Sequence, residues 1–126
     1  MTLSHAITLH KYNIIWYFLF QNIMDDANIY PNSQVTIQAG DQTKLSEIKK
    51  DSPHPEFQES FVFLLKQEQS DEINITICDV DNGSELGKVT LSLIELAEES
   101  LQRKILPINP DQPYMTVTLS ANIKYC

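Results

Sequence analysis

An acidic segment between residues 79 and 85 holds the side chains best suited to chemistry in this sequence. Asp79 and Asp81 are separated by one residue, and Glu85 follows an Asn82-Gly83 pair that is typical of a turn. Calcium takes six to eight oxygen ligands, and clustered carboxylates supply both the oxygens and the charge. The segment therefore offers part of a calcium ligand set.

Catalytic side chains do not group together in this sequence. His5, His10 and His54 are isolated, and no serine or cysteine stands in a nucleophile motif nearby. The chain contains three glycines in all, so it has no glycine-rich loop for phosphate. His54 lies between two prolines in a predicted surface loop, where a structural role is the simpler interpretation. We expect no enzymatic activity.

The charge of the chain narrows the range of partners. The net charge is −8 and the pI is about 4.7. Nucleic-acid binding needs a basic footprint, so we expect no nucleic-acid partner. Simple adsorption to anionic lipid is also disfavoured, although a small basic patch can act locally. Cys78 and Cys126 form no Cys-x-x-Cys pair and no cluster with histidine, which argues against zinc and favours a reducing, cytosolic setting.

Seven consecutive apolar residues, Ile14 to Phe20, stand near the start of the chain. A membrane-spanning helix needs about 20 such residues. No small-residue cleavage site follows the run, as one would in a signal peptide. Because the run is rich in aromatic and β-branched residues, we predict a buried first strand.

Apolar residues alternate with polar ones along the rest of the chain, as they do in half-buried strands. Phe57, Phe61 and Phe63, for example, share one face of a predicted strand. Residues 94–100 are predicted as a short helix at most. Eight short strands are predicted in total, over residues 14–20, 35–37, 43–49, 57–63, 73–77, 86–93, 103–108 and 115–123. This regular spacing predicts an all-β, antiparallel sandwich.

Three stretches of the sequence resemble the C2 domain family. Residues 52–63, SPHPEFQESFVF, are similar to the family's Asn-Pro-x-Trp-Asn-Glu-x-Phe-x-Phe signature, with Phe57 in the place of the tryptophan. Residues 73–87 run from a strand into an acidic loop and a Leu-Gly step, and residues 86–93 resemble the strand that follows. The resemblance implies an eight-stranded antiparallel C2-type β-sandwich over residues 12–126, with residues 1–11 as an unassigned N-terminal segment.

Within the C2 family, the sequence looks most like the second C2 domain of the extended synaptotagmins. Residues 31–40, the compressed acidic loop before Leu86, and residues 102–106 carry this likeness. Those proteins are anchored in the endoplasmic reticulum, bridge it to the plasma membrane, and carry a lipid-transfer domain beside several C2 domains. The resemblance implies one module of a lipid-transport protein, on the cytosolic face of membranes at endoplasmic reticulum–plasma membrane contact sites.

The C2 resemblance also implies where calcium would bind, because the family uses two facing loops rich in aspartate. Asp79 and Asp81 match the paired aspartates of one loop, and Glu85 is the nearest third carboxylate. Asp26 belongs to the facing loop, where Asn32 stands in the place of a second aspartate. An asparagine keeps one oxygen but loses the charge. We therefore expect a degraded calcium site, calcium-independent function and no cofactor.

The C2 family often binds phosphoinositides through lysines on a concave sheet, and Lys44, Lys49 and Lys50 are the candidates here. Each such lysine contributes about 1 kcal/mol near an anionic surface, so three lysines with Glu47 and Asp51 among them form a weak patch. If residues 44–50 form one regular strand, Lys44 and Lys50 share a face and Lys49 points away. A solvated strand face is the competing interpretation.

Two non-catalytic functions follow from these patterns. One is a peripheral module that binds anionic phospholipid membranes weakly and gains strength from tandem neighbours. The other is a module that packs against a neighbouring C2 domain or a partner protein. A calcium-dependent phospholipid-binding C2 domain and a scaffold for protein–protein contacts alone are the alternatives.

Overall fold

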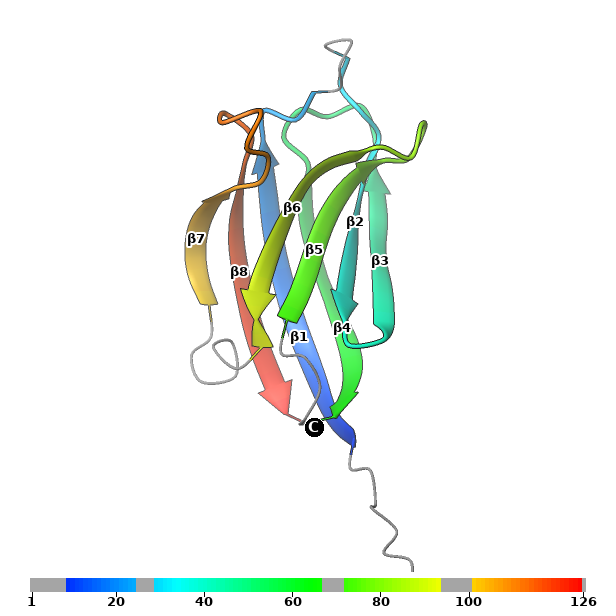
Figure 1. Cartoon of the computed structure of the whole chain (residues 1–126), viewed down its shortest axis with the longest axis vertical. Helices are drawn as coiled ribbons and strands as arrows, with labels where there is room; N and C mark the ends of the chain where they lie inside the picture. Colours follow the sequence, from blue (N-terminus) through cyan, green and yellow to red (C-terminus); the bar gives the residue numbers. More distant parts are fainter. Residues whose placement is uncertain (1–8, 25–28, 67–71, 94–100, 126) are drawn as a thin grey trace, which may run out of the picture.

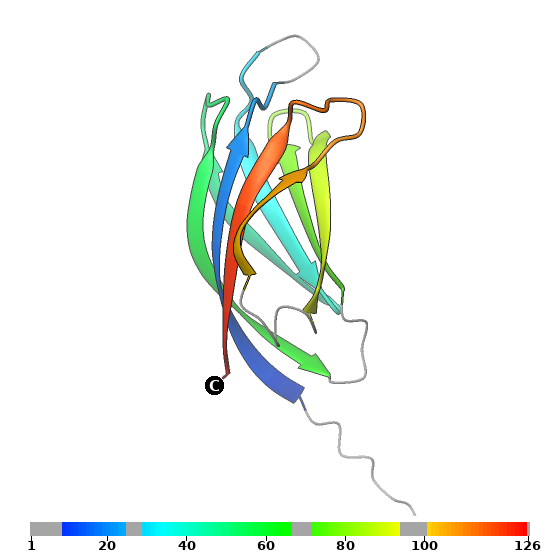
Figure 2. The same ribbon diagram turned by 90° about the vertical axis from the view of Figure 1, so that its left-hand side faces the viewer.

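The chain folds as a β-sandwich of two four-stranded antiparallel sheets (Figures 1 and 2). The computed structural model describes residues 9–24, 29–66, 72–93 and 101–125. Sheet A has the strand order β4-β1-β8-β7, and sheet B has the order β3-β2-β5-β6. The strands are β1 (Leu9–Gln21), β2 (Ser33–Ala39), β3 (Gln42–Lys49), β4 (Glu56–Lys66), β5 (Glu72–Asp79), β6 (Glu85–Ser92), β7 (Leu101–Pro107) and β8 (Thr116–Tyr125).

The apolar run near the start of the chain forms the centre of sheet A, between β4 and β8. Ile14, Trp16, Phe18 and Phe20 point into the core and are at most 2% exposed, whereas Ile15 on the opposite face is 41% exposed. The predicted strand is thus confirmed. Within the described part of the chain, no helix is long and apolar enough to cross a membrane.

The other predicted strands are confirmed as well, and so is the all-β antiparallel sandwich. Phe57 and Phe63 are at most 1% exposed, and Phe61 packs partly buried beside them. The short helix predicted over residues 94–100 lies outside the described residues. β1 begins at Leu9, ahead of the predicted domain start at residue 12, and that boundary stays a prediction.

The open side of the sandwich between β6 and β7 is closed by the segment that follows β7. The Lys88 N–H donates to the Ile108 carbonyl oxygen at 2.8 Å, and the Asn109 side-chain amide donates to the Leu86 carbonyl at 3.1 Å. A Cβ at Gly87 would lie 2.6 Å from Cδ1 of Ile108, so glycine is required where Ile108 crosses β6. The segment that follows β7 therefore covers the core at the edge strand β6.

Candidate functional site

Four loops meet at one end of the sandwich, at the top of Figure 1, which we call the loop end. They comprise residues 22–32, 50–55, 80–84 and 108–115, with residues 25–28 outside the described part. Ile29, Tyr30 and Tyr114 expose 59%, 44% and 54% of their surface there. The loop end therefore combines acidic residues with exposed apolar side chains.

Asn32 is the residue that joins three of these loops. Its side-chain oxygen Oδ1 accepts a hydrogen bond from the Asp51 backbone N–H at 2.9 Å. Its backbone carbonyl oxygen accepts another from the Val80 N–H, also at 2.9 Å. Since a backbone N–H can only donate, the first bond fixes the orientation of the amide. The Asn32 Nδ2 group then donates to Oδ2 of Asp81 at 2.9 Å. A neutral amide thus holds the loop carboxylate that a cation would otherwise attract.

Asp79 and Asp81 lie in one turn, and one carboxylate oxygen of each accepts a hydrogen bond. Asp79 is 3% exposed, and its Oδ1 accepts a hydrogen bond from the Asp81 backbone N–H at 3.0 Å. The Asp79 carbonyl oxygen accepts another from the Gly83 N–H at 2.8 Å. The pair of aspartates therefore shapes its own turn.

Glu85 does not join this pair. It lies opposite Cys78 in the β5–β6 register, and Cys78 points outward while Asp79 points inward. Burial raises the pKa of the Cys78 thiol, and the charge of the nearby Glu85 raises it further. The Glu85 carboxylate therefore lies on the outer face of sheet B, away from Asp79.

The described part of the loop end does not by itself assemble a calcium ligand set. Among the described residues, no three acidic, histidine or cysteine side chains lie close enough to hold a metal. The Ser33 hydroxyl, which is fully buried and without a partner, is paired in register with Asp79, but one hydroxyl does not replace the missing carboxylates. Asp26 lies outside the described residues, so its predicted place as a ligand stays a prediction.

Asn22 ties the remaining loop into the network. Its backbone N–H donates to Nδ1 of His54 at 3.2 Å, and its side-chain amide donates to the Tyr114 carbonyl oxygen at 2.8 Å. Asn22 and Asp51 both have positive φ, at 62° and 52°, a conformation that asparagine and aspartate tolerate better than most residues. All four loops are therefore connected by hydrogen bonds from neutral donors. The sequence pattern did not reveal these roles of Asn22 and Asp51.

The candidate lysines do not lie on one regular strand face. A bulge places both Ser46 and Glu47 opposite Val35, which changes the alternation of β3. Lys44 turns toward the core side, with Nζ 5.9 Å from the centre of the Phe63 ring on β4. Lys49 pairs with Glu47, at 2.6 Å between Nζ and Oε1.

Lys44 lies in a seam between the edge strands β3 and β4. The Gln42 side-chain amide pairs with both the N–H and the carbonyl oxygen of Leu64. The Glu59 carboxylate accepts a hydrogen bond from the Glu47 backbone N–H at 3.2 Å. Lys50 follows the end of β3 and is exposed, so it is the candidate lysine most accessible to a lipid surface.

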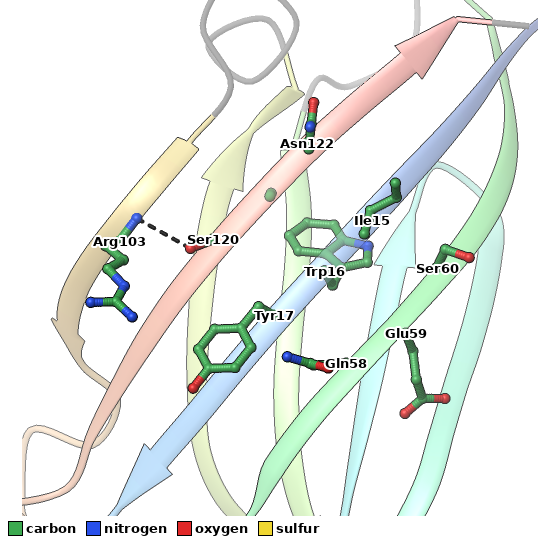
Figure 3. A pocket seen from close by; sticks show the side chains of 10 residues that line it. Ile15, Trp16, Tyr17, Gln58, Glu59, Ser60, Arg103, Ser120 and Asn122 are labelled. Atoms are coloured by element: carbon green, nitrogen blue, oxygen red, sulfur yellow. Dashed lines mark hydrogen bonds between the residues drawn. The ribbon is translucent and has the colours of Figure 1, made fainter.

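A second candidate surface is a hollow of about 690 Å³ on the outer face of sheet A (Figure 3). It crosses all four strands of the sheet, from β4 through β1 and β8 to β7. We call it the sheet A hollow. Its outward side chains include Ile15, Tyr17, Gln58, Ser60, Ser120 and Arg103. Sequence reasoning missed this hollow, because it treated the outward residues of β1 only as the solvent side of a strand.

A family model described as the C2 domain matches residues 19–108. No curated protein sequence matches the chain. Among solved structures, the chain resembles a part of extended synaptotagmin 2 that holds its SMP domain and two C2 domains, with a TM-score of 0.79 and 16% identity over 96% of this chain and 29% of that one. It also resembles a single C2 domain of a plant extended synaptotagmin 1, with a TM-score of 0.71 and 16% identity over 93% of this chain and 95% of that one.

The fold also occurs within an enzyme. Human GIVD cytosolic phospholipase A2 matches with a TM-score of 0.76 and 19% identity over 98% of this chain and 17% of that one. At these identities, likeness to solved structures shows the fold alone. The chain spans less than a third of the extended synaptotagmin 2 structure that it resembles.

Proposed function

The chain belongs to the C2 domain family, and from that premise we propose that it is a non-catalytic docking module that works without calcium. The single observation that carries this proposal is the placement of Asn32. Its amide joins the Asp51 backbone and the Asp81 carboxylate, so the loops are held together by neutral donors. The function therefore needs no divalent ion to order the loop end.

Hydrogen-bond energies favour a loop end that is already ordered by Asn32 over one that is ordered only when an ion binds. The bond from Asn32 to Asp81 is exposed to solvent and contributes about 0.5–1.5 kcal/mol. A calcium ion would have to displace this donor before Asp81 could act as a ligand. It would also find Glu85 on the other face of the sheet. We expect calcium affinity far below that of sensor sites.

Two targets suit such a module. The exposed side chains of Ile29, Tyr30 and Tyr114 at the loop end suit shallow contact with a membrane, and Lys50 adds one cation beside them. A neighbouring C2 domain or a partner protein is the second target. The likeness to extended synaptotagmins supports a parent protein of membrane contact sites and lipid transport, on the cytosolic side of the endoplasmic reticulum.

The direct test combines calorimetry with vesicle sedimentation. Calcium titrated into the pure chain should give no saturating heat at micromolar concentration. Sedimentation with phosphatidylserine-containing vesicles should be the same in calcium and in EDTA. Heat that saturates near micromolar calcium and disappears in Asp81→Asn would overturn the proposal.

The lysines are tested in the same assay. Lys50→Glu should weaken sedimentation with anionic vesicles more than Lys49→Glu, because Lys49 already pairs with Glu47. Lys44→Glu serves as a comparison, since its ammonium group lies over Phe63 and not on an open face. Equal binding by all three variants would reject a role for these lysines in lipid contact.

A further inference from the structure

The sheet A hollow holds hydrogen-bond donors that have no partner in the described part of the chain. The Gln58 amide, the Ser60 hydroxyl and the Arg103 guanidinium have no hydrogen-bond or ion-pair partner among the residues that the structure describes. The hydroxyl oxygen of Ser120 accepts the Arg103 backbone N–H at 3.2 Å, which leaves its proton free to donate. These donors border one cavity, so a ligand rich in acceptors would satisfy several at once.

The carboxylates around the hollow, by contrast, are engaged. Glu56 accepts a hydrogen bond from the Tyr17 hydroxyl at 2.8 Å. Glu59 turns away toward β3, where both its oxygens lie 3.2 Å from the Glu47 backbone nitrogen (Figure 3). Arg103 is therefore the cation of the hollow without a carboxylate partner among the described residues.

Arg103 is held in place by an unusual backbone. It is the only arginine in a chain of net charge −8. Its φ is 32°, in the left-handed region that arginine rarely adopts, and it lies in the irregularity between Leu101 and Lys104 where β7 pairs with β8. A strained backbone of this kind costs about 1–3 kcal/mol and is concentrated at functional positions. The bulge places the guanidinium beside Tyr17, where its charge lowers the Tyr17 pKa against the larger effect of Glu56.

We propose that the sheet A hollow binds a peptide segment of a protein partner in which an aspartate or glutamate stands beside an apolar residue. The carboxylate pairs with Arg103, whose planar fork matches a single carboxylate well. The apolar side chain lies against Ile15 and the ring of Tyr17, while Gln58 and Ser60 donate to the peptide carbonyl groups. This inference rests on the proposed docking function, and it names the surface and the partner's chemistry.

Charge decides between a peptide and a bilayer at this surface. Binding to an anionic bilayer sums about 1 kcal/mol per cation, and the hollow is lined by one cation in a strongly acidic chain. A single carboxylate needs only one arginine. The hollow, of about 690 Å³ and open to solvent, is wide enough for a few side chains of a peptide.

The experiment is a selection of random heptapeptides displayed on phage, carried out on the whole chain in EDTA. Enriched peptides are synthesised and their affinities measured by fluorescence anisotropy on the unmodified chain and on variants. Arg103→Glu should weaken binding about tenfold or more, because a charge-assisted hydrogen bond is lost and a like charge gained. Lys88→Glu is the matched control, since it makes the same charge change at an exposed position of sheet B.

Gln58→Glu tests the same surface without touching the strained residue. It adds a carboxylate to the hollow from β4 and should also weaken the binding of acidic peptides. The proposal stands if enriched peptides carry an acidic residue beside an apolar one, and if both hollow variants weaken them while Lys88→Glu does not. It fails if selection yields basic or uncharged peptides, no enrichment, or an equal loss in Lys88→Glu.

Vesicle sedimentation tests whether the hollow binds an anionic lipid and not a peptide. If Arg103→Glu abolishes sedimentation with phosphatidylserine vesicles and leaves the selected peptides bound, the hollow contacts lipid and the peptide proposal is wrong. Calcium titration does not involve Arg103. A failure of the calcium result and a failure of the peptide result can therefore be told apart.

Discussion

The loop end and the sheet A hollow use their polar groups in opposite ways. At the loop end, the acidic side chains accept hydrogen bonds from Asn32 and from the backbone of their own turn. In the hollow, the donors of Arg103, Gln58 and Ser60 have no protein partner among the described residues. Both regions lie on the same sandwich. The polar groups of the loop end bond to one another, whereas those donors of the sheet A hollow have no partner in the described part of the chain.

This difference separates a region whose polar groups stabilise the fold from a region whose polar groups are open to a ligand. Polar groups that are already satisfied contribute little to binding, because a ligand must first displace their partners. The donors of the hollow are exposed and hydrated, so a ligand exchanges water for its own acceptors without breaking a bond within the described part of the protein. We therefore expect mutations at the loop end to act mainly on stability, and mutations in the hollow to act mainly on binding.

The largest expected effect comes from the core that supports the hollow. Trp16 is 1% exposed, lies beneath the hollow and stacks on Phe18 at 5.3 Å between ring centres. Trp16→Ala should lower the free energy of unfolding by about 3–5 kcal/mol. Urea denaturation followed by circular dichroism measures it. A loss below about 1 kcal/mol would mean that the hollow does not depend on this packing.

A smaller effect is expected when the amide that joins the loops is removed. Asn32→Leu keeps the approximate size but removes the bonds to Asp81 and Asp51, so it should lower the free energy of unfolding by about 2 kcal/mol. Peptide binding in the hollow should be unchanged. Stability equal to that of the unmodified chain would show that the loops are held together by other contacts.

Asn32→Asp sharpens the same comparison with a change of one charge. The introduced carboxylate still accepts from the Asp51 N–H but faces Asp81 without a donor, so stability in EDTA should fall by about 1 kcal/mol. Excess calcium should restore it. Asn82→Asp is the control, because it adds the same charge in an exposed position that keeps the bond from the Ser84 N–H. Equal calcium responses in the two variants would contradict the assigned role of Asn32.

The smallest effect is a shift in the titration of Tyr17. The hydrogen bond to Glu56 raises the Tyr17 pKa, burial and the charge of Glu56 add to this, and Arg103 lowers it. Arg103→Gln should therefore raise the pKa further, and Glu56→Gln should bring it down, as followed by NMR of the ring carbon. The stabilising contribution of this bond is present below the ordinary tyrosine pKa of 10.0 and is lost as pH rises through the folded value. An unchanged Tyr17 pKa in Arg103→Gln would show that the guanidinium does not lie near Tyr17.

The sequence predicted the strands because burial in a sandwich has a local signature. The alternation in Phe57, Phe61 and Phe63 and the aromatic run of β1 require only that one face be buried. Cys78 follows the inward-facing Ile77 by one residue and is therefore half-buried on the outward face of β5. The C2 family and the sandwich followed from these patterns together with the motif in β4.

The site was harder to predict, because it depends on contacts between distant segments. Lys44 faces Phe63 because it pairs with the inward-facing Ile37, and the bulge at Ser46 and Glu47 changes the alternation only after it, which no periodic pattern reveals. Asn32 was expected to weaken a calcium site by its missing charge, but its bonds to Asp51 and Asp81 depend on how three loops meet. The sheet A hollow depends on how four strands lie side by side, and the sequence pattern did not reveal it.

Thermal unfolding of the unmodified chain in excess calcium and in excess EDTA tests the central claim most directly. A calcium site filled at a hundredfold excess over its Kd would add about 2.7 kcal/mol to the free energy of unfolding. In a domain of this size, each kcal/mol raises Tm by about 3 °C or more. We predict the same Tm in both buffers. A Tm several degrees higher in calcium would contradict the account of the loop end.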